Sequence, residues 1–566
     1  MRGILAAALT LAALPAFGQY DILIEHGAIY DGSGHAPFTG DVAIKGDRIV
    51  YVGPKAKGSA AKTIDATGLA VAPGFTNMLS HVEHSLLVDS RALSDLTQGI
   101  TLEVLGEGHS MGPESQAMAE RDLARQGDLK FPITWKTLGG YLQGVQDKGV
   151  AVNVASTVGA AQVRDFVLGE DDVQPDAAQL AEMRKLVKEA MLEGALGVSS
   201  ALIYAPGTYA RTPELAALAT EAGQCGGIYI SHIRSEGDRL IEAIDELISI
   251  SKTSGAPAEI FHLKAAGRGN WDKLDTAIAH IEAARKSGPR VTADMYAYTA
   301  GATGLDAAMP PWVQAGGLES WIGRLKDPAI RAKVADQMRD PKAGFENLYL
   351  HAGAAGTLLL AFKNPDLKPL TGKTLAEVAK ERGKSPEDTA IDLVIEDGSR
   401  VGVAYFLMSE DNIKKQMRLP WVSFGSDEQA PAPEGVFLKS NPHPRAYGNF
   451  AKVLGHYVRD EKVMSLQEAI RRLSALPAAN LSLKDRGRLQ KGYYADLVLF
   501  DAGKIADHAT YEKPHQLATG VVDVIVNGSL ALENGAPTGK LNGRFVKGRA
   551  ASQGCKQSAA AWDWSK

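Results

Sequence analysis

The sequence has 566 residues, of which 45% are hydrophobic, 22% charged and 7% aromatic. This composition is typical of a globular protein with a large apolar core, and it excludes a disordered or collagen-like chain. Lys and Arg number 61 against 66 Asp and Glu, a net charge of -5, so the chain lacks the basic excess that binds nucleic acid. The two cysteines, Cys225 and Cys555, are too few for a disulfide framework and lack the paired spacing of a structural zinc site. We therefore expect stability to come from the core.

The first residues have the pattern of an export signal. Arg2 supplies a positive charge, residues 4–14 form an apolar run, and Ala16-Phe17-Gly18 has the small-x-small form of a cleavage site. The alternative is a membrane anchor, but the run is shorter than the roughly 20 apolar residues that span a bilayer. We predict a signal peptide at 1–18 and a periplasmic or secreted protein that leaves the membrane once the signal is cleaved.

Short runs of alternating apolar and polar residues near both chain ends indicate strands. Residues 20–52 contain three such runs broken by glycines. Residues 495–500 and 522–526 repeat the pattern, and Asn527-Gly528 then forms a typical hairpin turn. We predict a small antiparallel sheet at each end of the chain, flanking a middle of a different kind.

The middle of the chain alternates buried-type strands with helical stretches, such as 176–193 and 236–253, whose apolar residues have helical spacing. Eight strands in this order predict a closed (β/α)8 barrel. The candidate strands are 71–79, 100–106, 151–157, 196–201, 227–233, 258–264, 290–295 and 421–427. Because the gap before the last strand is far longer than one helix, we predict an inserted helical subdomain or lid at about 301–419.

Polar residues close several of these strands, and the active site of such a barrel forms at the carboxyl ends of its strands. They include His81, Glu107, His232, His262 and Asp427. Imidazole and carboxylate groups hold Zn²⁺ or a similar ion while leaving a position open for water. A single histidine at a strand end is more often structural, but two on adjacent strands together with a carboxylate on the last strand favour a metal site.

Five segments resemble the amidohydrolase superfamily and, within it, the N-acyl-D-amino-acid deacylases (D-aminoacylases). They are 71–75, 231–238 (Ser-His-Ile-Arg-Ser-Glu-Gly-Asp), 262–264 (His-Leu-Lys), 443–448 (His-Pro-Arg-Ala-Tyr-Gly) and 486–497. The resemblance runs from about residue 20 to 548 and implies an α/β fold, a TIM barrel with a small β-sandwich built from both chain ends. The predicted parts are the signal peptide 1–18, sandwich halves 19–70 and 481–548, a barrel 71–480 containing the insertion, and a tail 549–566.

The chain departs from the superfamily pattern at the first strand and the fourth. The usual Asp-x-His-x-His reads Asn77, Leu79 and His81 here, so one of two histidines of the first metal position is missing. The carboxylated lysine that bridges two metals in many relatives has no counterpart in residues 196–201. These losses favour one tightly bound Zn²⁺ rather than two.

The second strand also departs from the D-aminoacylase pattern, which has a cysteine in a Gly-Asn-Cys-Gly motif. This chain reads Gly106-Glu107-Gly108 instead. Glu107 is the residue there that can bind a metal, so we predict it as a ligand together with His81, His232 and His262, with Glu103 in reserve. We expect Glu236 and Glu428 to be solvated or to cap helices.

The resemblance implies an enzyme that hydrolyses a C–N amide bond with Asp427 as the general base. It also implies that Lys264, Arg445, Tyr204 and Tyr296 hold the substrate, the two cations gripping its free carboxylate. The alternative for Lys264 is a solvent-exposed strand end. We expect an N-acyl-D-amino acid or a related small amide as substrate.

Two other functions remain open from the sequence. One is a dipeptidase or another amino-acid amide hydrolase built on the same site. The other is a metal-poor binding protein, because Leu79 and the missing second-strand cysteine allow a barrel that kept its pocket and lost its chemistry.

Overall fold

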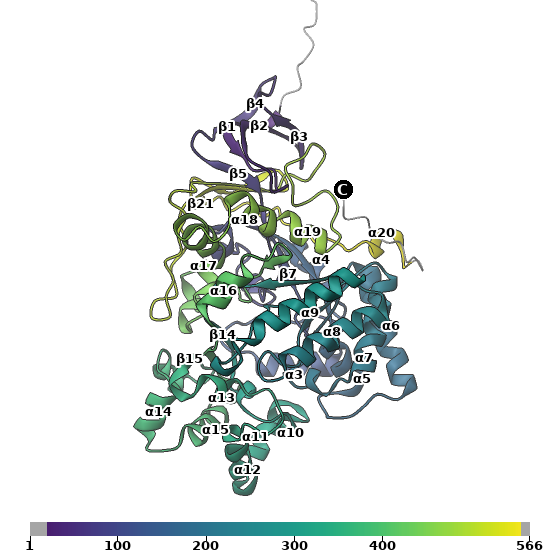
Figure 1. Cartoon of the computed structure of the whole chain (residues 1–566), viewed down its shortest axis with the longest axis vertical. Coiled ribbons are helices and arrows are strands. Elements are labelled where there is room, and N and C mark those ends of the chain that lie inside the picture. Colours follow the sequence, from purple (N-terminus) through teal and green to yellow (C-terminus); the bar gives the residue numbers. More distant parts are fainter. Residues whose placement is uncertain (1–19, 556–566) are drawn as a thin grey trace, which may run out of the picture.

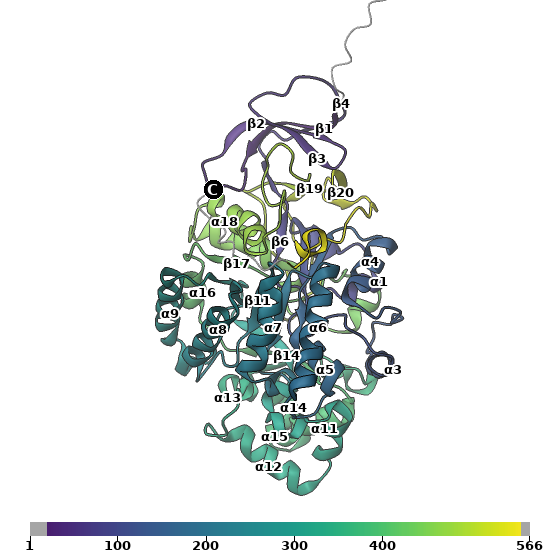
Figure 2. The ribbon, with the colours of Figure 1, turned by 90° about the vertical axis from the view of Figure 1, so that its right-hand side faces the viewer.

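The computed structural model describes residues 20–555, so the predicted signal peptide lies outside the described residues. The chain forms an elongated molecule with three parts in a row. A sheet domain lies at one end, the barrel in the middle and the inserted segment at the other end (Figures 1 and 2). The barrel is therefore in contact with both other parts.

Both chain ends contribute to one sheet of nine strands, ordered β21-β20-β19-β18-β5-β1-β2-β3 with β4 paired to β1. The two ends meet where β18 pairs antiparallel with β5. The predicted sheet segments are thus halves of one sheet, although β4 and β5 run parallel to β1 rather than antiparallel. The strands are β1 (Tyr20–Ile29), β2 (Phe38–Lys45), β3 (Arg48–Gly53), β4 (Ala60–Asp65), β5 (Ala70–Pro73), β18 (Leu497–Phe500), β19 (Val521–Val526), β20 (Ser529–Glu533) and β21 (Ala536–Pro537).

The barrel strands follow the predicted order and are parallel throughout. The third predicted strand is divided into two short pieces, and the ring closes where the N–H of Met78 donates to the carbonyl of Phe424 at 3.1 Å. The strands are β6 (Phe75–Asn77), β7 (Ile100–Leu105), β8 (Asn153–Ser156), β9 (Val158–Gly159), β10 (Gly197–Ala201), β11 (Ile228–His232), β12 (Ala258–Ile260), β13 (Val291–Met295) and β17 (Val422–Phe424). The (β/α)8 fold predicted from the sequence is confirmed.

The first predicted strand, 71–79, was wrong as one element, because the chain changes sheets at Gly74. β5 belongs to the nine-stranded sheet and β6 to the barrel. At the break, a Cβ on Gly74 would lie 2.2 Å from Oγ1 of Thr101, so only glycine fits this close approach.

Helices surround the barrel, and their apolar faces pack on the outside of its strands. α6 begins after Asp176, whose side chain accepts from the N–H of Gln179 while the Gln179 side chain accepts from the N–H of Asp176, a complete capping box. The main helices of the barrel layer are α4 (Leu138–Lys148), α5 (Ala160–Leu168), α6 (Ala177–Glu193), α7 (Thr212–Gln224), α8 (Leu240–Ser254), α9 (Lys273–Ser287), α17 (Arg445–Lys452) and α18 (Leu466–Leu473). Among residues 20–555 no helix has the length and apolar character needed to cross a membrane.

The inserted segment is mainly helical, as predicted, but it also contains a three-stranded antiparallel sheet in the order β14-β16-β15. That sheet was not predicted, because its small residues (Gly301, Ala302) carry little strand signal. Its elements are β14 (Ala300–Gly304), α10 (Pro311–Gln314), α11 (Gly317–Leu325), α12 (Pro328–Arg339), α13 (Leu348–Ala352), β15 (Thr357–Ala361), α14 (Leu375–Arg382), α15 (Pro386–Asp397) and β16 (Gly402–Phe406).

The C-terminal segment crosses the barrel and is tied to it covalently. The N–H groups of Gly543, Val546 and Gly548 donate to barrel carbonyls at 2.7 to 2.8 Å. A disulfide then joins Cys555 to Cys225, which follows α7, across a sequence separation of 330 residues. The expectation that stability comes from the core alone is therefore incomplete.

Candidate active site

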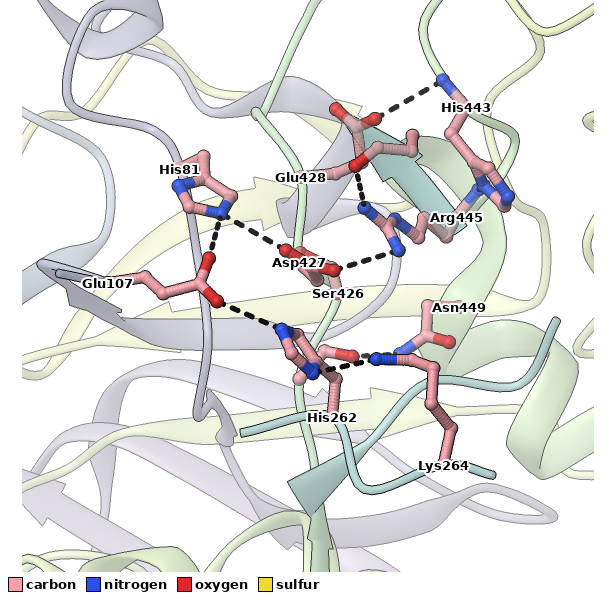
Figure 3. A network of polar contacts seen from close by, with 12 residues as sticks. His81, Glu107, His262, Lys264, Ser426, Asp427, Glu428, His443, Arg445 and Asn449 are labelled. Atoms are coloured by element: carbon pink, nitrogen blue, oxygen red, sulfur yellow. Dashed lines mark hydrogen bonds and ion pairs between the residues drawn. The ribbon is translucent and has the colours of Figure 1, made fainter. Parts of the chain in front are cut away.

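The carboxyl ends of the barrel strands carry a cluster of histidines and carboxylates. His81 follows β6, Glu107 follows β7, His232 ends β11, His262 follows β12 and Asp427 follows β17. Figure 3 shows the side chains of His81, Glu107, His262 and Asp427 pointing toward one another. The strand ends predicted from the sequence are thus brought together in space.

Two glycines allow Glu107 to turn into the cluster. Gly106 and Gly108 both have positive φ, 97° and 67°, which L side chains rarely adopt. Each also packs tightly: a Cβ on Gly106 would lie 2.4 Å from the carbonyl oxygen of Thr157, and one on Gly108 would lie 2.5 Å from the Cβ of Ala201. The Gly-Glu-Gly sequence is therefore required by the local backbone as well as by the cluster.

Glu107 lies at the centre of the cluster and uses both carboxylate oxygens. Its Oε1 is 3.0 Å from Nδ1 of His232 and 2.9 Å from Nε2 of His262. Its Oε2 is 3.1 Å from Nε2 of His81, which lies 3.0 Å from Oδ1 of Asp427. Two groups of three ligand atoms result, each within 4.8 Å of one another: Glu107, His232 and His262, and His81, Glu107 and Asp427.

Two residues of the cluster have strained backbones. His262 has φ 37° and Asp427 has φ 54°, in the left-handed region that non-glycine residues seldom occupy. Neighbouring groups hold both in place: the N–H of His262 donates to Oδ1 of Asp294 at 2.9 Å, and the N–H of Asp427 donates to the carbonyl of Leu79 at 2.8 Å. Such strain is concentrated at functional sites, where it fixes the direction of a side chain.

The charges of the cluster compensate one another. Burial opposes ionisation of Glu107, but the adjacent His262 and His232 outweigh it and hold the pKa of Glu107 well below its usual range. Burial acts in the same way on Asp427, where Arg445 and His81 outweigh it and lower the pKa. Both carboxylates are thus ionised at neutral pH, the form that binds a metal or accepts a proton.

Glu236 was expected to be solvated or a helix cap, and this expectation is wrong. Its side chain is buried, and Oε1 lies 2.9 Å from Nδ1 of His262 and 2.6 Å from Nζ of Lys264. A carboxylate behind a metal-binding histidine is the usual arrangement for fixing the ring orientation. The signal in the sequence is position: Glu236 follows His232 by four residues within the motif that carries the resemblance.

Lys264 is buried at the site, which excludes the alternative of an exposed strand end. Its Nζ contacts Glu236 and also lies 2.8 Å from Nδ1 of His262. Burial disfavours its charge, but Glu236 outweighs this effect and raises the pKa of Lys264. Because an ammonium has three N–H donors and Nδ1 of His262 donates to Glu236, at least one N–H of Lys264 remains for another acceptor.

Arg445 is 1% exposed and lies beside the predicted base. Its Nη1 is 2.9 Å from Oδ2 of Asp427, and its guanidinium lies 4.4 Å from the centre of the Tyr296 ring. Its Nε is buried without a hydrogen-bond partner among residues 20–555. The second predicted tyrosine, Tyr204, lies across the cluster with its ring 5.3 Å from that of His232.

Glu428 is half-buried and caps no helix. Its Oε1 accepts from the N–H of His443 at 3.3 Å, and burial raises its pKa. Like Glu236, it contributes to the surroundings of the cluster rather than to a solvated face.

Positions where the chain departs from the superfamily pattern have structural partners. Asn77 donates to Oγ of Ser426 at 2.8 Å and accepts from the N–H of Ser426 at 2.7 Å, so it holds the residue before Asp427. Leu79 packs inside the barrel with Met78, Leu102 and Val104. Glu103, the reserve ligand, is fully buried, and none of its contacts is to a histidine of the cluster.

The residues present fit a divalent metal. Both triads consist of imidazole nitrogens and carboxylate oxygens, the donor types that Zn²⁺ and similar ions accept. Nδ1 of His232 and Nε2 of His262 both face Oε1 of Glu107, and Glu236 supports His262 from behind. A barrel with this cluster at the carboxyl ends of its strands defines a metal-dependent hydrolase.

Comparison with known proteins assigns the chain to a family. The profile described as "Amidohydrolase family" matches residues 62–531. The chain belongs to the amidohydrolase family. The D-aminoacylase of Alcaligenes xylosoxydans xylosoxydans is 31% identical over 535 residues, covering 94% of this chain and 98% of that protein. The N-acyl-D-glutamate deacylase of the same organism is 30% identical, covering 95% and 99%.

Solved structures support the same family assignment. A D-aminoacylase described for its binuclear metal center has TM-score 0.78 at 31% identity, covering 93% of this chain and 100% of that one. The N-acyl-D-glutamate deacylase of Bordetella bronchiseptica, complexed with zinc and a phosphonate inhibitor, has TM-score 0.77 at 28% identity, with coverage of 94% and 100%. The resemblance to the D-aminoacylase branch that the sequence indicated is confirmed.

Proposed function

We propose that the protein deacylates small N-acyl-D-amino acids or closely related amides, releasing a carboxylate and a free amine. The observation that carries the proposal is the cluster itself, in which two ionised carboxylates and three histidines lie beside a buried arginine. Full-length relatives named D-aminoacylase and N-acyl-D-glutamate deacylase support the reaction class.

The cluster is proposed to hold one tightly bound Zn²⁺ between Glu107, His232 and His262. These side chains are 8%, 5% and 3% exposed, so they are shielded from solvent. The side chain of His81 in the other triad is 37% exposed, so water can replace it as a ligand more easily. When bound, the ion acidifies water and polarises the amide carbonyl.

Asp427 is proposed to be the general base. Its carboxylate is ionised and its orientation is fixed by His81 on Oδ1 and Arg445 on Oδ2. It can therefore take a proton from the attacking water and return it to the leaving nitrogen of the amide. Arg445 keeps Asp427 charged, which matches the need for a carboxylate at the start of the cycle.

The free carboxylate of the substrate is proposed to bind between Arg445 and Lys264. Arg445 offers the unpartnered Nε, and Lys264 offers an N–H that Glu236 does not accept. The Tyr296 ring contacts both cations, its centre 4.4 Å from the guanidinium and 5.4 Å from the ammonium, while Tyr204 faces His232. Each cation already has one carboxylate partner, Glu236 for Lys264 and Asp427 for Arg445, so the substrate carboxylate would use the N–H donors that these pairs leave free.

A mass-spectrometric screen tests the proposal. Metal-loaded enzyme is incubated with N-acyl-D-amino acids, their L enantiomers and dipeptides, and each hit is repeated as its methyl ester. We expect hydrolysis of N-acyl-D-amino acids with a clear preference for the free acid, because esterification removes the charge-assisted hydrogen bonds to the cations. Equal kcat/KM for acid and ester would overturn the assigned carboxylate site.

We further propose that residues 1–18 are removed during export and that the enzyme acts in the periplasm or outside the cell. The disulfide between Cys225 and Cys555 supports this location, since such bonds persist in oxidising compartments. Mass measurement of the mature protein tests the cleavage: we expect a chain that starts near Gln19, and an intact Met1 in the exported protein would contradict it.

A further inference from the structure

The loop 501–520, which joins β18 to β19, leaves the nine-stranded sheet and reaches the barrel. We call it the arm. Nδ1 of His515 lies 3.2 Å from the hydroxyl of Tyr447 on α17, and its Nε2 lies 2.9 Å from the carbonyl of Ser440. Oη of Tyr511 lies 3.0 Å from Nε2 of His443, which precedes α17. The arm therefore contacts the beginning of the helix that carries Arg445.

The hydrogen bonds of His443 determine its protonation. The ring is fully buried, and burial together with the nearby Arg445 holds the pKa of His443 well below its usual range, against a hydrogen bond to the backbone of Ala300. The imidazole is therefore neutral. Its Nδ1 accepts from the N–H of Arg445 at 3.0 Å, so the single ring proton is on Nε2. That N–H faces the hydroxyl oxygen of Tyr511 at 3.0 Å, which accepts it, and the carbonyl of Ala300 is a second acceptor nearby.

His443 in turn fixes the position of Arg445. The ring of His443 accepts from the backbone N–H of Arg445, and the backbone N–H of His443 donates to Oε1 of Glu428, the residue after Asp427 (Figure 3). Arg445 then lies 2.9 Å from Oδ2 of Asp427. A continuous series of contacts thus runs from Tyr511 through His443 and Arg445 to the proposed base.

Tyr511 also contacts the inserted segment. Its ring centre is 4.8 Å from that of Phe406 on β16, and it packs against the apolar cluster of Ala300, Leu358, Leu360 and Ala404 on the inserted sheet. The residue is therefore held between the insertion and the barrel, although it belongs to the sheet domain. Its ring supplies packing, while its hydroxyl supplies one specific hydrogen bond to His443.

We propose that Tyr511 is a positioning residue for substrate binding: its hydroxyl fixes the His443 ring, and through it the guanidinium of Arg445 that receives the substrate carboxylate. The inference rests on the proposed function for the role of Arg445. It assigns part of the substrate affinity to a residue outside the barrel.

Tyr511→Phe tests the proposal, because it removes the hydroxyl and leaves the ring. Loss of one neutral hydrogen bond predicts a rise in KM of about threefold to tenfold for the N-acyl amino acid. We expect kcat to change less than about twofold, with metal content unchanged, and the KM of the methyl ester to stay at its wild-type value. Tyr51→Phe is the matched control, since that hydroxyl bonds the carbonyl of Lys55 within the sheet domain.

An unchanged KM for the acid, or an equal rise for acid and ester, would overturn the proposal. A wild-type enzyme that hydrolyses no N-acyl amino acid would instead contradict the proposed function. A measurement without turnover separates the two cases: ¹⁵N NMR of histidine-labelled enzyme, with His443→Gln to assign the signal. We expect a neutral His443 protonated on Nε2, whose proton exchanges faster in Tyr511→Phe. Protonation on Nδ1, or unchanged exchange, refutes the inference whatever the substrate.

Discussion

Replacing Glu107 by Gln should abolish tight metal binding while leaving the fold intact. Glu107 uses Oε1 toward His232 and His262 and Oε2 toward His81, so both oxygens are engaged. Glutamine has the same size, but it replaces one oxygen by an NH₂ group that cannot act as a ligand and removes the negative charge. One triad therefore loses a ligand and the other loses the charge that attracts a cation.

The expected loss of metal affinity follows from the direct contact of Glu107 with the metal. Changing a residue behind a metal ligand typically costs 10- to 100-fold in affinity, so replacing Glu107 should cost more than about 100-fold, or about 2.7 kcal/mol. Competition with a chromophoric chelator measures the dissociation constant, and elemental analysis gives the stoichiometry. Glu103→Gln is the matched control. Glu103 is a buried glutamate on β7, the strand that Glu107 follows, and its contacts do not include the histidines of the cluster. Wild-type affinity in Glu107→Gln would refute its role as a ligand.

Three further changes test separate parts of the structure. Asp427→Asn should lower kcat by about 10²- to 10⁴-fold, as for other general acid–base groups, with metal still bound to Glu107, His232 and His262; a loss below about tenfold would assign the base to another group. Cys225→Ser should destabilise the protein, because the disulfide closes 330 residues and such bonds typically contribute about 2–4 kcal/mol; dithiothreitol should lower the Tm of the wild type and not that of the variant. Glu114→Gln should change the pH dependence of stability, because burial raises the pKa of Glu114 from 4.5 to about 7. A carboxyl whose folded pKa is raised loses stability as pH rises from about 4.5 to about 7, so the variant should be up to about 3 kcal/mol more stable than wild type at pH 8 and equal to it at pH 4. Urea unfolding at both pH values measures this, with the exposed Glu120→Gln as control.

The barrel could be predicted because its signals are local. Buried runs such as residues 100–106 and 227–233 are bounded by glycines and polar residues, and the carboxyl ends of parallel strands must meet at one edge. The sequence alone therefore predicts that one site contains His232, His262, Glu107 and Asp427. The change of sheets at Gly74 could not be predicted, because it depends on the close approach of Thr101.

Residues that act through distant partners had no such signal. Cys225 pairs with Cys555 across 330 residues, and two isolated cysteines have no spacing pattern that indicates pairing. Asn77 holds Ser426, and Tyr511 contacts His443, in each case across more than one element of the fold. Glu236 has one local signal, its position four residues after His232, but its burial depends on the neighbouring strand, which places His262 and Lys264 against it.

We propose above all that a metal-dependent site of this protein hydrolyses the amide bond of an N-acyl-D-amino acid. It is tested most directly by kcat/KM for one N-acetyl amino acid as the D and L enantiomers, measured with zinc-loaded enzyme and again after chelation. We expect turnover of the D enantiomer at a rate well above that of the L enantiomer, lost on chelation and restored by Zn²⁺. Turnover that survives complete removal of metal, or an equal rate for both enantiomers, would contradict it.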